Sequence, residues 1–335
     1  MRRLPVYFLL DCSESMIGPG IESLRIAVDS MISEMRRDPH ALETVWLSFI
    51  TFAGVAQQLI PLTPLEDIQS PVLRISPGTA LGGAIKLTAK AIALEVHKST
   101  LEQRGDFRPL VFIITDGFAT DDWTSAASSF KSVGCTVYAI GCGLDVDFHQ
   151  LGKITTNVLR VQEVGIECIG KLMKWISSSV QSASRGLAEI GTDSLTENLP
   201  ATVEKVNLSK EKNHDGRSTQ IFLLLHCQQK RGSYLARYVM DNATALYTVV
   251  ATHRLDSELM DTSSDKFSLP AVDAGAFHSH APCPYCEAST WWQCGNCKTL
   301  ACVTKEIPRR PVTCPVCGIS GVLTAMDFKI QQRSG

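Results

Sequence analysis

The chain has 335 residues, 44% of them apolar and 20% charged, which is an ordinary globular composition with room for about two domains. Its net charge of −2 and pI near 6.4 give no basic footprint, so neither nucleic acid nor a membrane surface is an expected partner. The apolar run after Pro5 is too short for a signal peptide, and no run reaches the roughly 20 residues of a membrane span, so we expect a cytoplasmic protein.

The first half of the chain alternates between apolar strands and amphipathic helices. In chain order, we predict a strand at 4–11, a helix at 21–37, strands at 45–50 and 55–60, a helix at 80–96, a strand at 110–115, a helix at 121–133, a strand at 135–140, a short helix at 147–151, a short strand at 158–161 and a helix at 166–180. Nearly continuous apolar strands between helices indicate a mostly parallel sheet covered on both faces. The predicted fold class is therefore α/β, with a doubly wound, Rossmann-like sheet.

The composition changes near the end of the last of these helices, where Ser- and Thr-rich sequence replaces the alternating pattern. We predict a first domain at 1–183, a linker at 184–203 and a smaller β-rich domain at 204–335. Within this second domain, strand-like runs lie at 220–226, 234–240 and 247–252, and a cysteine-rich segment with the pattern of a zinc ribbon lies at 278–320.

Oxygen-bearing side chains follow two of the predicted strands and one loop. Asp11, Ser13 and Ser15 form a D-x-S-x-S pattern after the first strand, Thr79 precedes a helix, and Asp116 ends a strand within Thr-Asp-Gly. The first pattern alone also suits a helix N-cap. However, the carboxyl ends of parallel strands meet at one edge of a sheet, where ligands bind. Oxygen donors recurring at that edge indicate a site for a hard divalent cation such as Mg²⁺.

These five residues resemble the metal-ion-dependent adhesion site of von Willebrand factor A domains, and the resemblance covers residues 4 to about 180. It implies that the hydroxyls of Ser13, Ser15 and Thr79 and the carboxylates of Asp11 and Asp116 hold the cation, directly or through water. It also implies one open coordination position, which an acidic residue of a partner protein fills. The expected function is adhesion to a partner.

Other residues near the predicted ligands receive other roles. Cys12 is a soft ligand poorly suited to Mg²⁺ and is interpreted as a small packing residue. Glu14 alternates with the ligands and is expected to point elsewhere, and Asp121 is a candidate N-cap for the helix that follows it. The ligand loops contain no histidine or lysine that could serve as a general base. We therefore predict a protein that is not an enzyme, with a metal-dependent hydrolase as the alternative.

Seven of the twelve cysteines lie between 283 and 317, which favours metal binding over disulfides in a cytosolic chain. They form three C-x-x-C pairs and one single cysteine: Cys283 with Cys286, Cys294 with Cys297, Cys314 with Cys317, and Cys302. Each pair can present two thiolates to one tetrahedral Zn²⁺. Joining the first pair to the last would make a zinc ribbon.

Seven thiols and one further ligand would complete two tetrahedral zinc sites. His280 is the favoured eighth ligand because it lies three residues before Cys283, with His278 and Cys227 as alternatives. Zinc without an open coordination position would be structural and would hold the β-rich domain together; a redox-responsive zinc switch is the alternative. The Trp291-Trp292 pair is expected to pack over the metal core.

The whole chain resembles the TerY family of bacterial tellurium-resistance-associated proteins. The resemblance rests on D-C-S-E-S-M, on T-D-G-F-A-T-D-D-W and on the terminal C-P-x-C-G, together with the seven-cysteine module. It implies an adaptor in a phosphorylation-linked stress response, with a PP2C-type phosphatase and a serine/threonine kinase as partners. No residue indicates tellurite chemistry itself.

Overall fold

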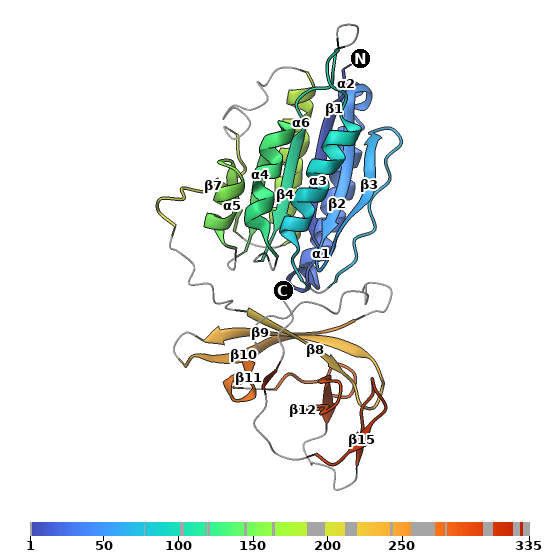
Figure 1. Cartoon of the computed structure of the whole chain (residues 1–335), viewed down its shortest axis with the longest axis vertical. Helices are drawn as coiled ribbons and strands as arrows, with labels where there is room; N and C mark the ends of the chain where they lie inside the picture. The colour runs from blue at the N-terminus through green and yellow to red at the C-terminus, as the bar shows by residue number, and fades with distance from the viewer. Residues whose placement is uncertain are drawn as a thin grey trace. The chain divides into compact units, whose positions relative to one another are not determined.

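The chain divides into two units, residues 1–216 and 217–335. The computed structural model (Figure 1) describes residues 2–76, 78–100, 104–117, 119, 121–143, 146–162, 165–185, 198–211, 220–241, 244–255, 272–278, 280–303, 311–323 and 329–330. No helix within these ranges is long and apolar enough to cross a membrane.

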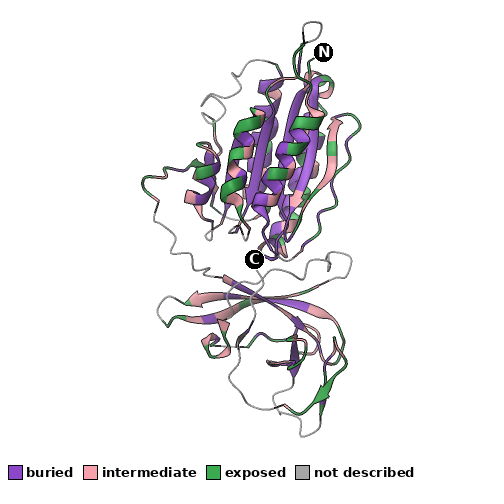
Figure 2. Cartoon of the chain, in the orientation of Figure 1, coloured by how far each residue is buried: buried purple, intermediate pink, exposed green. Residues whose placement is uncertain are grey.

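The first unit is built on a seven-stranded sheet with the order β3-β2-β1-β4-β5-β6-β7. The strands are β1 (Leu4–Asp11), β2 (Val45–Phe52), β3 (Ala56–Pro64), β4 (Leu110–Thr115), β5 (Thr136–Cys142), β6 (Val158–Val161) and β7 (Val203–Lys205). The five central strands are parallel, whereas β3 and β7 are antiparallel to their neighbours. Figure 2 shows that these central strands are buried. The predicted doubly wound, mostly parallel sheet is confirmed.

Helices cover both faces of this sheet (Figure 1). They are α1 (Pro19–Met35), α2 (Pro39–Thr44), α3 (Leu81–Glu95), α4 (Trp123–Val133), α5 (Phe148–Ile154) and α6 (Ile166–Ser184), with a short 3-10 helix η1 (Glu14–Met16) after β1. Side chains alternate across a strand, so Phe8 packs with α1 and α6 in one core and Leu9 packs with α3 and α4 in the other.

A row of aromatic rings crosses the first of these cores and fixes the register of the strands. Phe8 stacks on Phe49 with ring centroids 5.2 Å apart and on Phe112 at 5.5 Å, and Phe112 stacks on Tyr138 at 5.3 Å. Each pair is directly opposite in register. Stacked aromatic pairs of this kind each contribute about 0.5–1.5 kcal/mol beyond their buried area. The resulting alignment brings the ends of β1 and β4 to the same edge of the sheet.

The boundary between the units differs from the prediction of a linker at 184–203 and a second domain from 204. Val203 pairs with Val161 and Lys205 with Leu159, so β7 completes the first sheet and the second unit begins at 217. A strand of three residues is too short to give a periodic signal in the sequence. Residues 186–197 of the predicted linker lie outside the described ranges.

The second unit contains a five-stranded sheet with the order β10-β9-β8-β13-β12. Its strands are β8 (Gln220–His226), β9 (Ser233–Asp241), β10 (Leu246–Arg254), β12 (Thr290–Gln293) and β13 (Leu300–Val303), beside the two-stranded pairs β11 (Val272–Asp273) with β16 (Lys329–Ile330) and β14 (Val312–Thr313) with β15 (Ser320–Gly321). Tyr238, Phe277 and Trp291 form an edge-to-face aromatic core beside buried cysteines. The three strand-like runs predicted for this unit correspond to β8, β9 and β10.

Candidate metal centres

Asp11 stands at the last position of β1, at the carboxyl edge of the parallel sheet. Its side chain is fully buried. One carboxylate oxygen, Oδ1, accepts a hydrogen bond from the backbone N–H of Ser13 at 2.9 Å, and Oδ2 accepts one from the Thr115 hydroxyl at 2.5 Å. Both its own loop and the neighbouring strand therefore fix the orientation of this carboxylate.

The loop after β1 meets the loop after β4 through hydroxyl groups. The Oγ atoms of Ser13 and Ser15 lie 2.8 Å apart, and the Ser15 hydroxyl donates to Oδ1 of Asp116 at 2.5 Å. Asp116 comes directly after Thr115, which binds Asp11. Four of the five predicted oxygen ligands are thus brought together from positions about a hundred residues apart in the sequence.

Thr79, the fifth predicted ligand, is buried in a loop that is bound to the loop after β1. Oε2 of Glu14 accepts a hydrogen bond from the backbone N–H of Gly78 at 2.9 Å, and the carbonyl of Cys12 accepts one from the N–H of Ser76 at 3.0 Å. Glu14, which was expected to point away from the ligands, holds the segment that carries Thr79. Cys12 is buried in the core, as its assignment to packing requires.

Burial has a direct electrostatic consequence for Asp11. Desolvation raises its pKa from the ordinary value of 3.8 to about 6, against the opposing effect of the hydrogen bonds from Thr115 and Ser13. A nearby cation would favour the charged carboxylate and reverse this shift. Two carboxylates and several hydroxyls are hard oxygen donors, so the donor set fits Mg²⁺ or a similar divalent cation.

Asp121 has a different role from the predicted one. The helix α4 is capped by Asp122, whose side chain accepts from the N–H of Ser125 at 3.3 Å. The carboxylate of Asp121 instead accepts from the N–H groups of Gly82 and Gly83 at the start of α3, at 2.8 and 2.7 Å. A capping residue is normally predicted for the helix that directly follows it in the sequence. Asp121 instead caps α3, which lies about forty residues earlier in the chain.

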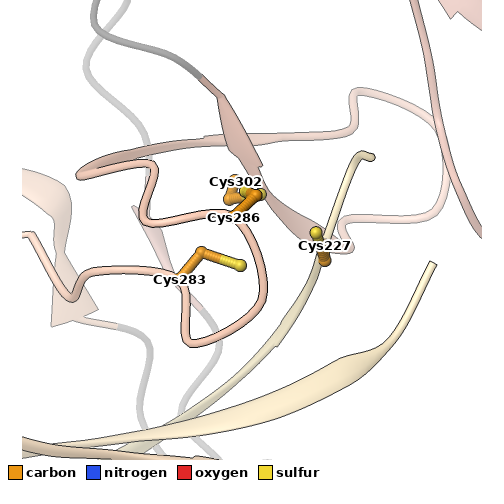
Figure 3. A group of neighbouring side chains, drawn as sticks. All are labelled: Cys227, Cys283, Cys286 and Cys302. Carbon is orange, nitrogen blue, oxygen red and sulfur yellow. The ribbon is translucent and has the colours of Figure 1, made fainter. Parts of the chain in front are cut away.

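The cysteines of the second unit form two clusters, in each of which all four sulfur atoms lie within 4.8 Å of one another. The first cluster contains Cys227, Cys283, Cys286 and Cys302, and Figure 3 shows these side chains converging. The second cluster contains Cys294, Cys297, Cys314 and Cys317. The shortest distances between sulfur atoms within the clusters are 3.5–3.7 Å. Zn–S bonds of about 2.3 Å place tetrahedral sulfurs about 3.8 Å apart, so both clusters fit Zn²⁺.

Four turns of the same form supply seven of these eight thiols. In each turn the N–H of a cysteine donates to the carbonyl five residues later, and its carbonyl accepts from the N–H four residues later. These turns begin at Cys227, Cys283, Cys294 and Cys314. The residue four positions after the cysteine has a positive φ in every case, which is rare outside glycine. The shared geometry presents the cysteines of all four turns in the same way, as a zinc knuckle would require.

The turn at Cys227 is the knuckle that the C-x-x-C pattern does not reveal. Lys230 stands where the other turns carry their second cysteine, and its N–H donates to Sγ of Cys227 at 3.2 Å. Cys302, on β13, provides the missing thiol, and the N–H of Gln228 donates to its sulfur at 3.3 Å. In the sequence this turn appears only as a single cysteine followed by polar residues and Gly232. That pattern alone is too weak to identify a metal-binding turn.

Two expectations about ligand pairing are therefore corrected. His280 belongs to neither cluster; its ring lies against Trp291, with centroids 4.9 Å apart, and partial desolvation lowers its pKa. His278 also lies outside both clusters, so Cys227 occupies the eighth position. In addition, Cys314 and Cys317 join Cys294 and Cys297 rather than the first C-x-x-C pair. Cys294 and Cys297 lie in the turn between β12 and β13, whereas Cys302 on β13 joins that first pair.

The thiols within each cluster differ in their acidity. Burial raises the pKa of Cys283 to about 11. At Cys297 burial also acts to raise the pKa, but hydrogen bonds from Thr299 and the neighbouring thiols outweigh it and lower the pKa to about 6. Hydrogen bonds that stabilise a thiolate also prepare it as a metal ligand, since Zn²⁺ binds the deprotonated form.

Comparisons with known proteins identify the first unit. Residues 6–164 match the von Willebrand factor type A domain. Matrilin-3 of the chicken, Gallus gallus, is 25% identical over 182 residues, which cover 52% of this chain and 39% of matrilin-3. The chain thus spans about two fifths of the length of this relative.

Similar solved structures include proximal thread matrix protein 1 of the mussel byssus with a zinc-occupied MIDAS motif, at 20% identity and a TM-score of 0.44, covering 53% of this chain and 48% of that one. Another is BatB from Bacteroides thetaiotaomicron, at 22% identity and a TM-score of 0.39, covering 55% of this chain and 99% of that one. The matched family region, residues 6–164, lies within the first unit.

Proposed function

We propose that this chain, whose residues 6–164 form a von Willebrand factor type A domain, is a metal-dependent protein-interaction adaptor without catalytic activity. The observation that carries the proposal is the meeting of Asp11, Ser13, Ser15 and Asp116 at one sheet edge, with the Thr79 loop bound beside them. These residues would hold Mg²⁺ or another divalent cation.

The chemistry of the donor set favours recognition of an acidic partner. The two carboxylates bring two negative charges and the three hydroxyls bring none, so the ion's charge is no more than balanced. Mg²⁺ takes six oxygen ligands and retains water readily, so five protein oxygens leave a position that a ligand can enter. A Glu or Asp of a partner protein supplies the hard, anionic oxygen that this position prefers.

Binding rather than catalysis is favoured by what surrounds the ligands. The three ligand loops carry neither histidine nor lysine, so the sequence supplies no evident general base there. A metal-dependent hydrolase is the competing function. Phosphoester hydrolysis by the purified chain, lost in Asp116→Ala, would support that alternative.

The two cysteine clusters support a structural role for zinc in the second unit. Four thiolates complete a tetrahedral Zn²⁺ and leave no position for substrate, which is the arrangement of structural sites. The first cluster lies in the core of this unit, where Cys227, Cys283 and Cys302 are buried. We assign one Zn²⁺ to each cluster, with folding of the unit coupled to binding.

The cellular setting rests on the resemblance to the TerY family. We propose that the adaptor is bacterial and cytoplasmic, and that it acts in a tellurium-resistance-type stress response. Its partners would be a PP2C-type phosphatase and a serine/threonine kinase, one of which supplies the acid for the cation.

The test is a binding assay with a purified PP2C-type phosphatase and a purified serine/threonine kinase as the proposed partners. We expect the wild-type chain to bind one of them, and Thr79→Ala and Asp11→Ala to lose binding, while Thr63→Ala on the edge strand β3 serves as the matched control. EDTA should abolish binding and Mg²⁺ alone should restore it. Zn²⁺-dependent binding that the Asp11→Ala and Thr79→Ala variants retain would place recognition in the second unit, and unchanged binding by the variants would refute the metal bridge.

A further inference from the structure

The helix α3 begins without a capping side chain of its own. Its N-cap residue is Ala80, which makes no side-chain hydrogen bond to the helix. The first N–H groups of a helix have no partner within the helix and need acceptors from elsewhere. Here the acceptor is Asp121, whose two carboxylate oxygens take the N–H groups of Gly82 and Gly83 separately, at 2.8 and 2.7 Å.

This cap joins the two loops that carry distant predicted ligands. Thr79 lies two residues before α3, and Asp121 lies five residues after Asp116, in the segment between β4 and α4. A carboxylate that accepts two N–H groups fixes both the separation and the orientation of the segments it joins. A helix N-terminus also attracts negative charge, which strengthens the contact.

Backbone packing at the same point leaves little freedom between the loops. A Cβ atom on Gly82 would lie 2.6 Å from the carbonyl oxygen of Asp122 and 2.7 Å from Cα of Trp123. On Gly83 it would lie 3.7 Å from Oδ2 of Asp121, an ordinary contact distance. The start of α3 is therefore in direct contact with the start of α4, and only a glycine at position 82 permits it.

We propose that Asp121 is a positioning residue for the cation site. It holds the Thr79 loop against the Asp116 loop and so sets the distance between these two ligands. The inference rests on the proposed metal site. Residues that orient metal ligands in this way typically change metal affinity by about 10–100-fold when they are removed.

The experiment measures Mn²⁺ binding to the full-length, zinc-loaded chain by electron paramagnetic resonance, with thermal unfolding recorded in parallel. Asp121→Ala should weaken Mn²⁺ binding by about tenfold or more. Asp121→Asn keeps one acceptor oxygen, so its Mn²⁺ affinity should lie between those of Asp121→Ala and the wild type, and the variant should remain folded. Asp122→Ala is the matched control, because it removes the exposed cap of α4 and should leave Mn²⁺ affinity unchanged.

A double variant separates positioning from simple helix capping. Ala80→Ser gives α3 a local cap, so in the Asp121→Ala background it should recover thermal stability without recovering Mn²⁺ affinity. Recovery of both properties, or wild-type Mn²⁺ affinity in Asp121→Ala, would overturn the positioning role of Asp121 but not the proposed metal site. Absence of Mn²⁺ binding in the wild-type chain would instead overturn the proposed function, and the positioning role with it.

Discussion

At the scale of single residues, the buried Asp11 carboxylate predicts an unusual pH dependence for the metal-free chain. In the unfolded chain the Asp11 carboxyl loses its proton near pH 4. In the folded chain burial raises its pKa to about 6, so the carboxyl stays protonated to a higher pH. Its stabilising contribution is therefore present below pH 4 and is lost as pH rises through 6. Two pKa units correspond to about 3 kcal/mol of unfolding free energy.

Urea unfolding at pH 4.5, 6 and 7, in wild type and Asp11→Asn, measures this contribution as a difference between the two proteins. We expect the wild type to lose stability relative to the variant as pH rises, without divalent cations. Saturating Mg²⁺ should reverse the trend, because the cation binds the carboxylate form. Parallel pH profiles of the two proteins would contradict the prediction.

The eighth thiol gives a second prediction at this scale. Elemental analysis should find about two Zn²⁺ per wild-type chain, because each cluster supplies four thiols. Cys227→Ala should lower the content to about one, since the first cluster then has only three ligands. His280→Ala should keep both ions, since its ring packs on Trp291. Loss of zinc in His280→Ala would contradict this prediction and show that His280 is a zinc ligand.

The ligand types were predictable from the sequence, but the residues that hold them were not. Asp11, Ser13 and Ser15 recur at alternate positions, and the C-x-x-C pairs have fixed spacing, so both produce local patterns. Glu14 and Asp121 act through contacts with segments about forty to sixty residues away. Such contacts depend on the packing of the sheet and leave no periodic trace.

At the scale of elements, long apolar strands and helices were predictable, whereas short ones were not. The strand at 4–11 and the helix that became α3 carry strong periodic signals over many residues. The helix α2 has only six residues, and β7 has three. Their structure comes from a local cap, Asp38, in one case and from pairing with β6 in the other.

The contact between α3 and α4 makes a testable prediction for Gly82. Replacing a helical glycine by alanine normally stabilises a helix by about 1 kcal/mol. Gly82→Ala should instead destabilise the chain by about 1–3 kcal/mol, because the new Cβ would meet the Asp122 carbonyl at 2.6 Å. Gly170→Ala on α6 meets nothing within 4 Å and is the control that should gain stability. Denaturant unfolding of both variants decides the matter.

At the scale of the whole molecule, the two units depend on different chemistry. The first unit has two large apolar cores on either side of a parallel sheet, and its proposed cation lies at the edge of that sheet. The second unit has a smaller core, to which three cysteines of the first cluster contribute directly. Removing zinc should therefore affect the second unit far more than the first.

Calorimetry of the full-length chain should resolve this difference as two unfolding transitions. Structural Zn²⁺ contributes apparent binding free energies of about 10–16 kcal/mol, so a strong zinc chelator should abolish or greatly lower the transition of the second unit. Mg²⁺ at 100 times its dissociation constant should stabilise only the first unit, raising its free energy of unfolding by about 2.7 kcal/mol. Asp116→Ala should lose the Mg²⁺ effect alone, and Cys314→Ala should change the other transition alone. A single transition that responds to both metals would instead show that the units unfold cooperatively.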